Sequence, residues 1–109
     1  MDIEKVREAF LEMPEAEECT PFGDDVLVFK NNQGKIFGLL SLGGSFVASM
    51  KCDPDRAIEL REEYPDVVVP GYHLNKKHWN SIYFERFPDS LFIELIQHSF
   101  DLVTKKKKK

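Results

Sequence analysis

The sequence has few of the features that mark secreted, membrane-spanning or zinc-binding proteins. Its 109 residues include two cysteines, too few for a disulfide framework or a four-thiolate zinc site. The longest apolar runs, such as residues 36–40, are far shorter than the ~18–20 residues that cross a bilayer. Residues 1–4 have neither the basic nor the apolar character of a secretory leader. We therefore expect a cytoplasmic protein with two free thiols and no membrane partner.

The sequence also lacks the patterns that accompany catalysis. The four glycines within residues 34–44 cannot be written into a P-loop or a dinucleotide-binding fingerprint. His73 and His78 lie five residues apart, which is not the i, i+4 spacing of a zinc helix, and no suitable ligands lie nearby in sequence. Cys19 and Cys52 are best interpreted as small hydrophobic residues rather than nucleophiles. We predict a protein that is not an enzyme and that holds no metal or cofactor.

Positive charge is scarce outside the C-terminal end. The chain has 15 Lys and Arg against 19 Asp and Glu, and because residues 105–109 are all lysine, residues 1–104 carry 10 against 19, a net charge of −9. Such a body repels polyanions, so any anion-binding surface must be local. We expect residues 105–109 to form a disordered tail. It either complements the preceding helix end and raises solubility or tethers the protein to DNA.

The apolar periodicity predicts one α+β domain over residues 1–104. A helix begins after Asp2 and ends before Pro14, a second is opened by Asp53 and Pro54, and a third is capped by Asp89. Strands are expected at residues 17–22, 26–30, 35–42, 45–52, 67–69 and 81–85. The order α-β-β-β-β-α-β-β-α predicts a two-layer sandwich with the helices on one face of a mainly antiparallel sheet. In the last helix the expected buried face is Phe92, Leu95, Ile96, Ser99, Leu102 and Val103.

Residues 72–80 are the segment most suggestive of binding. They combine side chains that donate hydrogen bonds to phosphates with flat rings that stack on bases or lie against sugars. The donors are His73, Asn75, Lys76, Lys77, His78 and Asn80, and the rings are Tyr72 and Trp79. The ordinary interpretation of the same residues is that the rings anchor the core and the lysines are solvated.

A resemblance favours the binding interpretation. Five segments carry the resemblance, at residues 21–23, 26–30, 35–37, 70–80 and 99–103. The most specific part is the motif His-Leu-Asn-Lys-x-His-Trp at residues 73–79. They resemble the MmcQ/YjbR-like family of small bacterial proteins. The resemblance implies a CyaY-like fold shared with frataxin and a DNA-binding role through a double-wing arrangement of β-hairpins. The family motif falls on His73, Leu74, Asn75, Lys76, His78 and Trp79.

Two functions of different classes follow from these observations. The first is a monomeric, non-enzymatic DNA-binding module of modest affinity that uses residues 72–80. In it, Lys76 and Lys77 contact phosphates, Asn75 and His73 donate hydrogen bonds, and Trp79 supports the loop or packs on a sugar; His78 and Asn80 complete the site.

The second function is a frataxin-like acidic ridge that binds metal or a protein partner. Glu4, Glu8 and Glu12 recur at i, i+4 on the first predicted helix, and hard cations favour such oxygen ligands. The ordinary interpretation is a solvated helix face.

Overall fold

The computed structural model describes residues 1–44, 46–71 and 74–104. The elements are α1 (Ile3–Leu11), β1 (Glu17–Cys19), β2 (Val26–Lys30), β3 (Ile36–Ser41), β4 (Val47–Lys51), α2 (Pro54–Glu63), β5 (Val68–Pro70), β6 (Trp79–Tyr83), the 3₁₀ turn η1 (Phe84–Arg86) and α3 (Asp89–Val103). This order confirms the predicted α+β sandwich. The predicted tail, residues 105–109, lies outside the described residues.

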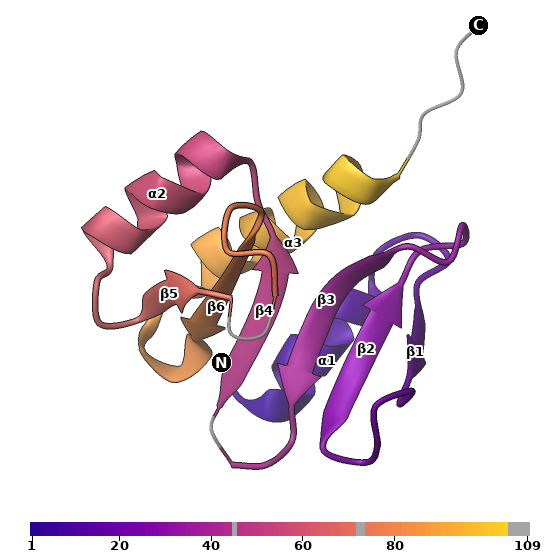
Figure 1. The fold of residues 1–109 in the computed structure, drawn as a ribbon. Helices are drawn as coiled ribbons and strands as arrows, with labels where there is room; N and C mark the ends of the chain where they lie inside the picture. The colour runs from indigo at the N-terminus through magenta and orange to yellow at the C-terminus, as the bar shows by residue number, and fades with distance from the viewer. Residues whose placement is uncertain (45, 72–73, 105–109) are drawn as a thin grey trace, which may run out of the picture.

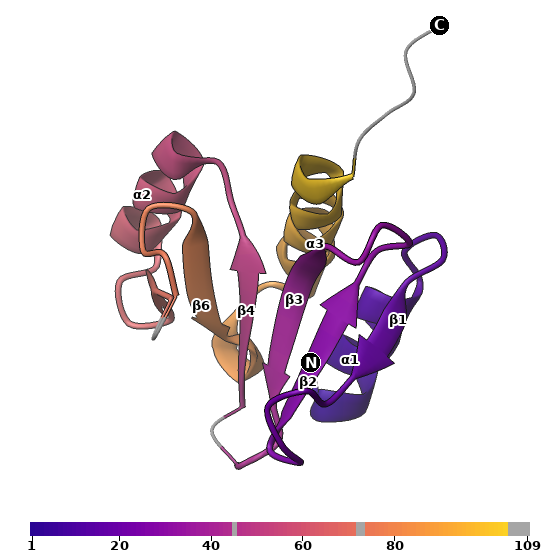
Figure 2. The same cartoon turned by 45° about the vertical axis from the view of Figure 1, so that its right-hand side comes forward.

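The strands form one antiparallel sheet in the order β1-β2-β3-β4-β6-β5. α2 joins β4 to β5, and the last strand, β6, lies between these two strands in the sheet. Figures 1 and 2 show α1 and α3 behind the sheet, with the connection from β5 to β6 in front of it. Within the described residues, no helix is both long and apolar enough to span a membrane.

Strand pairing sorts the side chains onto two faces. Residues paired across antiparallel strands point to the same side of a sheet. Leu40 is paired with Ala48, which is paired with Ile82, and all three side chains are buried in the core. Their chain neighbours, Leu39, Ser49 and Ser81, form the next row of pairs and therefore point to the face that the helices leave open.

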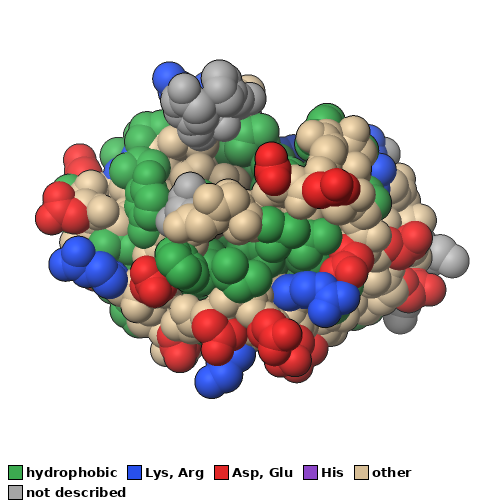
Figure 3. All heavy atoms as spheres, turned by 90° about the horizontal axis from the view of Figure 1, so that it is seen from below, with side chains coloured by type: hydrophobic (Ala, Val, Ile, Leu, Met, Phe, Trp, Pro, Cys, Tyr) green, Lys and Arg blue, Asp and Glu red, His purple; other side chains and the backbone are tan. Residues whose placement is uncertain are grey.

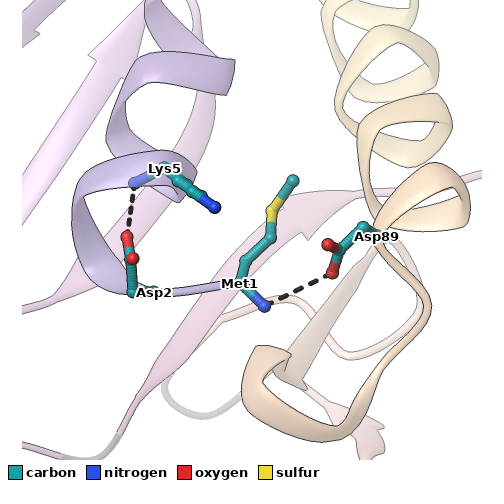
Figure 4. A network of polar contacts seen from close by, with 4 residues as sticks. All are labelled: Met1, Asp2, Lys5 and Asp89. Carbon is teal, nitrogen blue, oxygen red and sulfur yellow. Dashed lines mark hydrogen bonds and ion pairs between the residues drawn. The ribbon is translucent and has the colours of Figure 1, made fainter.

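Two of the three predicted helix caps are confirmed. The Asp2 carboxylate accepts a hydrogen bond from the backbone N–H of Lys5 at 2.9 Å (Figure 4). Asp53 accepts from the backbone N–H of Arg56 at 3.4 Å, and Pro54 occupies the first position of α2. These bonds satisfy N–H groups that have no partner within the helix.

The predicted cap of α3 is wrong. Pro88 occupies the cap position, and Asp89 is the first helical residue. The Asp89 carboxylate instead lies 3.3 Å from the N-terminal ammonium of Met1, to which it forms an ion pair (Figure 4). A carboxylate in the first turn also interacts favourably with the helix dipole. The prediction failed because a long-range charge competed for the side chain.

The last predicted strand begins and ends earlier than expected. β6 spans Trp79–Tyr83 rather than residues 81–85, because its pairing with β4 runs from Trp79 opposite Lys51 to Tyr83 opposite Val47. The chain then turns into η1, where the backbone N–H of Phe84 donates to the carbonyl of Phe46 at 3.2 Å. The edge strand β1 also ends at Cys19, before the predicted residue 22.

The buried face of α3 differs from the prediction at its last turn. Leu102 is 47% exposed, and Phe100 is buried instead. The Phe100 ring packs edge-on against Phe37, with ring centroids 5.2 Å apart. The amide of Asn31, in the turn between β2 and β3, donates to the carbonyl of Val103 at 3.2 Å. The end of α3 therefore lies over this turn rather than over a strand, and Leu102 has no core to enter.

Phe10 joins α1 to the sheet and requires a glycine opposite it. Its ring stacks on Phe29, with centroids 4.5 Å apart, and meets Phe92 edge-on. A Cβ atom on Gly38 would lie 2.2 Å from Cε1 of Phe10. Only glycine lets the ring approach the backbone of β3 so closely.

We therefore expect Gly38→Ala to lower the free energy of unfolding by about 1–3 kcal/mol through overpacking. Gly43→Ala is the matched control, because the nearest atom to its added Cβ lies 4.0 Å away; it should change stability by less than about 0.5 kcal/mol. Urea denaturation measures both. Equal stability of the two variants would contradict the close packing of Phe10 on β3.

Candidate functional site

Two side chains clamp the connection between β5 and β6 to α2. Nε of Arg61 donates to Oδ1 of Asn80 at 2.7 Å, and Nη2 of Arg61 donates to the carbonyl of Lys76. Nδ2 of Asn80 donates to the carbonyl of Ala57 at 3.3 Å. Asn80 is 1% exposed, so its amide holds the loop in place and is not available to a ligand.

Asn75 shapes the outer part of this loop. Its Oδ1 accepts a hydrogen bond from the backbone N–H of Lys77 at 3.0 Å, and its carbonyl accepts from the backbone N–H of His78 at 3.1 Å. An Asn side chain that bonds the backbone two residues ahead mimics a turn. The turn leaves Asn75, Lys76 and Lys77 exposed at the surface.

The base of the loop contains Trp79 and His78, two members of the predicted site. Trp79 lies in β6 and is half-buried, and a Cβ on Gly71 would lie 2.8 Å from its Cβ. His78 is also half-buried, and its carbonyl accepts a hydrogen bond from the backbone N–H of Cys52 at 2.8 Å. His73 lies outside the described residues. The structure thus brings Asn75, Lys76 and Lys77 to the surface together and places Asn80 in the interior.

A groove of about 840 Å³ lies between this loop and the open face of the sheet. Leu74 and Lys76 line it on the loop side. The other lining residues come mainly from the strands and are Phe22, Val26, Leu39, Ser41, Val47, Ser49, Val69, Pro70, Ser81 and Tyr83. Oγ of Ser49 and Oγ of Ser81 are hydrogen-bonded to each other at 2.7 Å within it.

The sequence analysis did not identify this groove, although a signal was present. β2 and β3 have apolar residues at consecutive positions, such as Val26 and Leu27, or Leu39 and Leu40. A strand with one solvated face shows alternation instead. Since no helix in the described part of the chain covers the other face, part of its apolar surface stays accessible in the groove.

Hydrophobic side chains also gather at the end of the sheet where β2 and β4 begin. Figure 3, seen from this end, shows hydrophobic side chains gathered among acidic ones. Phe22 is 69% exposed and Tyr83 is 43% exposed, and both line the groove. Two exposed aromatic rings therefore line the groove.

The acidic stripe of α1 lies at the surface. Glu4, Glu8 and Glu12 are all exposed. Arg7 lies in the same helix and forms a bidentate pair with Glu18, both bonds being 2.7 Å long. The hydrogen bond from Arg7 lowers the pKa of Glu18 below its ordinary value. No group of three His, Cys, Asp or Glu side chains in the described part of the chain is placed to hold a metal ion.

The two thiols are free. Cys52 is buried beside the N-terminus of α2, and burial raises the pKa of its thiol. A protonated thiol is a poor nucleophile at neutral pH. Cys19 is half-buried in the edge strand β1. Neither cysteine lines the groove among the described residues.

We expect Arg61→Met to loosen the loop, because it leaves the buried Oδ1 of Asn80 without its donor. The free energy of unfolding should fall by about 1–3 kcal/mol, and the amide of His78 should exchange faster with solvent. Arg86→Met removes an exposed arginine that makes no ion pair among the described residues, so it should change neither quantity. Unchanged exchange at His78 in Arg61→Met would contradict the clamp.

Comparison with known proteins places the chain in a family. The YjbR family model matches residues 11–102. The uncharacterized protein YbdF of Escherichia coli O157:H7 is 42% identical over 102 residues, which cover 92% of this chain and 82% of YbdF. The uncharacterized protein YyaQ of Bacillus subtilis is 38% identical over 66 residues, which cover 60% of this chain and 54% of YyaQ.

Solved structures show the same fold. Protein DR2400 of Deinococcus radiodurans, whose crystal structure is described as a DUF419 domain, superposes with a TM-score of 0.87 at 38% identity, covering 95% of this chain and 79% of that one. A protein from Pseudomonas syringae superposes with a TM-score of 0.78 at 21% identity, covering 95% of this chain and 100% of that one, and this likeness concerns the fold alone. From the match over residues 11–102 and the identity to YbdF, the chain belongs to the YjbR family.

Proposed function

We propose that this protein is a non-enzymatic DNA-binding module that contacts phosphates through the loop before β6. The observation that carries the proposal is the pair of exposed lysines, Lys76 and Lys77, on a loop clamped to α2 in a chain whose residues 1–104 have a net charge of −9. His73 and the base residues His78 and Trp79 belong to the same proposed interface through the family motif.

The donors of the loop are available to a ligand. Among the described residues, neither lysine forms an ion pair. The Oδ1 atom of Asn75 is used within the turn, while its Nδ2 atom has no hydrogen-bond partner among the described residues and can donate to a phosphate oxygen. Because Arg61 and Asn80 fix the backbone beneath, the loop that carries these donors is ordered before any ligand arrives, which reduces the entropy lost on binding.

The proposed contacts imply weak, salt-sensitive binding. A protein that neutralises about 3–5 phosphates has a slope of roughly −3 to −4 in log K against log salt. Contacts to phosphates position a protein on the duplex but do not read its sequence. The acidic body further lowers affinity, so we expect binding to be measurable at low ionic strength and to fade at physiological salt.

The double variant Lys76→Ala/Lys77→Ala tests the proposal. Fluorescence anisotropy with a labelled short duplex should show weaker binding and a salt slope flatter by about 2. The matched control is Lys5→Ala/Lys35→Ala, which removes the same charge from two exposed lysines elsewhere; its slope should remain that of the unmodified protein. Equal losses in the two double variants would mean that only net charge matters.

A chemical-shift titration with the same duplex separates the loop from the C-terminal lysines. Under the proposal, the amides of residues 74–80 shift first. Shifts confined to residues 105–109 would rule out the loop as the contact and assign DNA binding to the tail.

A further inference from the structure

We propose that the groove on the helix-free face of the sheet binds a small amphipathic anion. The apolar body of the ligand lies on the strands, and its anionic group pairs with Lys76. This site is distinct from the proposed DNA contact in its chemistry and does not depend on it, although the two share one side chain.

The size and lining of the groove suit a small molecule. Its volume of about 840 Å³ lies within the ~300–1,000 Å³ typical of ligand sites, which are mainly apolar with a few polar groups. Here the apolar surface comes from residues such as Leu39, Val47 and Val69, and the polar groups include the hydroxyls of Ser49 and Ser81. Those two hydroxyls satisfy each other and leave the floor largely apolar.

The charge of the lining selects an anion. Lys76 is the one charged side chain among the described lining residues, and no carboxylate is among them. Lys76 also has no ion-pair partner within the described residues. In a body of net charge −9, a lysine left unpaired beside apolar surface is complementary to one negative group and to no more. The ligand is therefore a monoanion with an apolar body rather than a polyanion.

The backbone that carries the cation is held at the edge of the groove by the fold. Arg61 binds the carbonyl of Lys76, and the turn closed by Asn75 fixes the following residue. Leu74, in the same loop, lines the groove beside it. The groove thus combines one positive charge with exposed aromatic rings, those of Phe22 and Tyr83, which matches a ligand that has both an anionic group and an apolar body.

Two fluorescent probes of similar shape test the proposal. Anilinonaphthalene sulfonate carries one negative charge, and N-phenyl-1-naphthylamine is uncharged; both become bright in apolar surroundings. The unmodified protein should bind each probe once, with a blue shift. Absence of saturable binding of both probes to the native protein would overturn the proposal.

Lys76→Ala should lower the affinity for the sulfonate probe by about fivefold, the effect of losing one partly solvated ion pair of about 1 kcal/mol. The affinity for the uncharged probe should stay unchanged. Lys77→Ala is the matched control: this residue is adjacent and exposed but does not line the groove, so it should alter neither probe. Equal sulfonate affinities in Lys76→Ala and Lys77→Ala would overturn the role of Lys76.

Val47→Phe fills the groove from β4 at a half-buried strand position, where an aromatic residue is well tolerated. It should reduce the affinity of both probes at least tenfold while the melting temperature stays close to that of the unmodified protein. Bright probe binding that survives this substitution would place the site elsewhere and overturn the proposal. DNA binding serves as the independent readout. Lys77→Ala should lower the affinity for DNA without changing that for the probes. Val47→Phe should lower the affinity for the probes without changing that for DNA.

Discussion

All the helices that the structure describes pack against one face of a six-stranded sheet, and this constraint decides where a ligand can bind. Phe10 of α1 enters a gap that Gly38 leaves in β3, and Phe92 and Ile96 of α3 complete the same layer. On the opposite face, residues 1–44, 46–71 and 74–104 form no second layer of secondary structure. Its apolar strand residues are therefore covered only in part, by the loop that leads into β6.

The link between this core and the loop is a buried polar network. Asn80 belongs to β6 and Arg61 to α2, and together they bind two carbonyls, one in the helix and one in the loop. A buried amide is costly unless its groups are bonded, and no side-chain nitrogen or oxygen that is buried in the described part of the structure lacks a partner. The same bonds that satisfy the interior thus set the position of Lys76 at the edge of the groove.

Local sequence signals predicted the elements well where the decisive contact lies within a few residues. Asp2 and Asp53 were recognisable as caps because each bonds an N–H three residues ahead. The errors occur where a distant partner decides. Asp89 is drawn to the N-terminal ammonium, 88 positions away in sequence, and the limits of β6 follow its pairing with β4 rather than its own residues.

The same distinction applies to the candidate site. The segment around Lys76 and Lys77 stood out in the sequence because it combines side chains that bind phosphates with aromatic rings and carries the family motif. The interior position of Asn80 did not, since nothing local to it reveals Arg61 as its partner. The groove was missed for a similar reason: it is assembled from five strands and two connecting segments, and only the placement of every helix on the other face leaves it open.

Lys76 connects the two proposed binding events through simple electrostatics. An anion held in the groove neutralises this lysine and leaves Lys77 as the main cation of the loop, so DNA would then encounter roughly half of the local positive charge in a body of net charge −9. Binding linkage is reciprocal. Bound DNA would therefore lower the affinity for the groove ligand by the same factor by which the bound ligand lowers the affinity for DNA. A protein with many lysines around the groove would show little such coupling, because each charge would be a small part of the total. Here the scarcity of positive charge makes one side chain sufficient to make the two ligands compete.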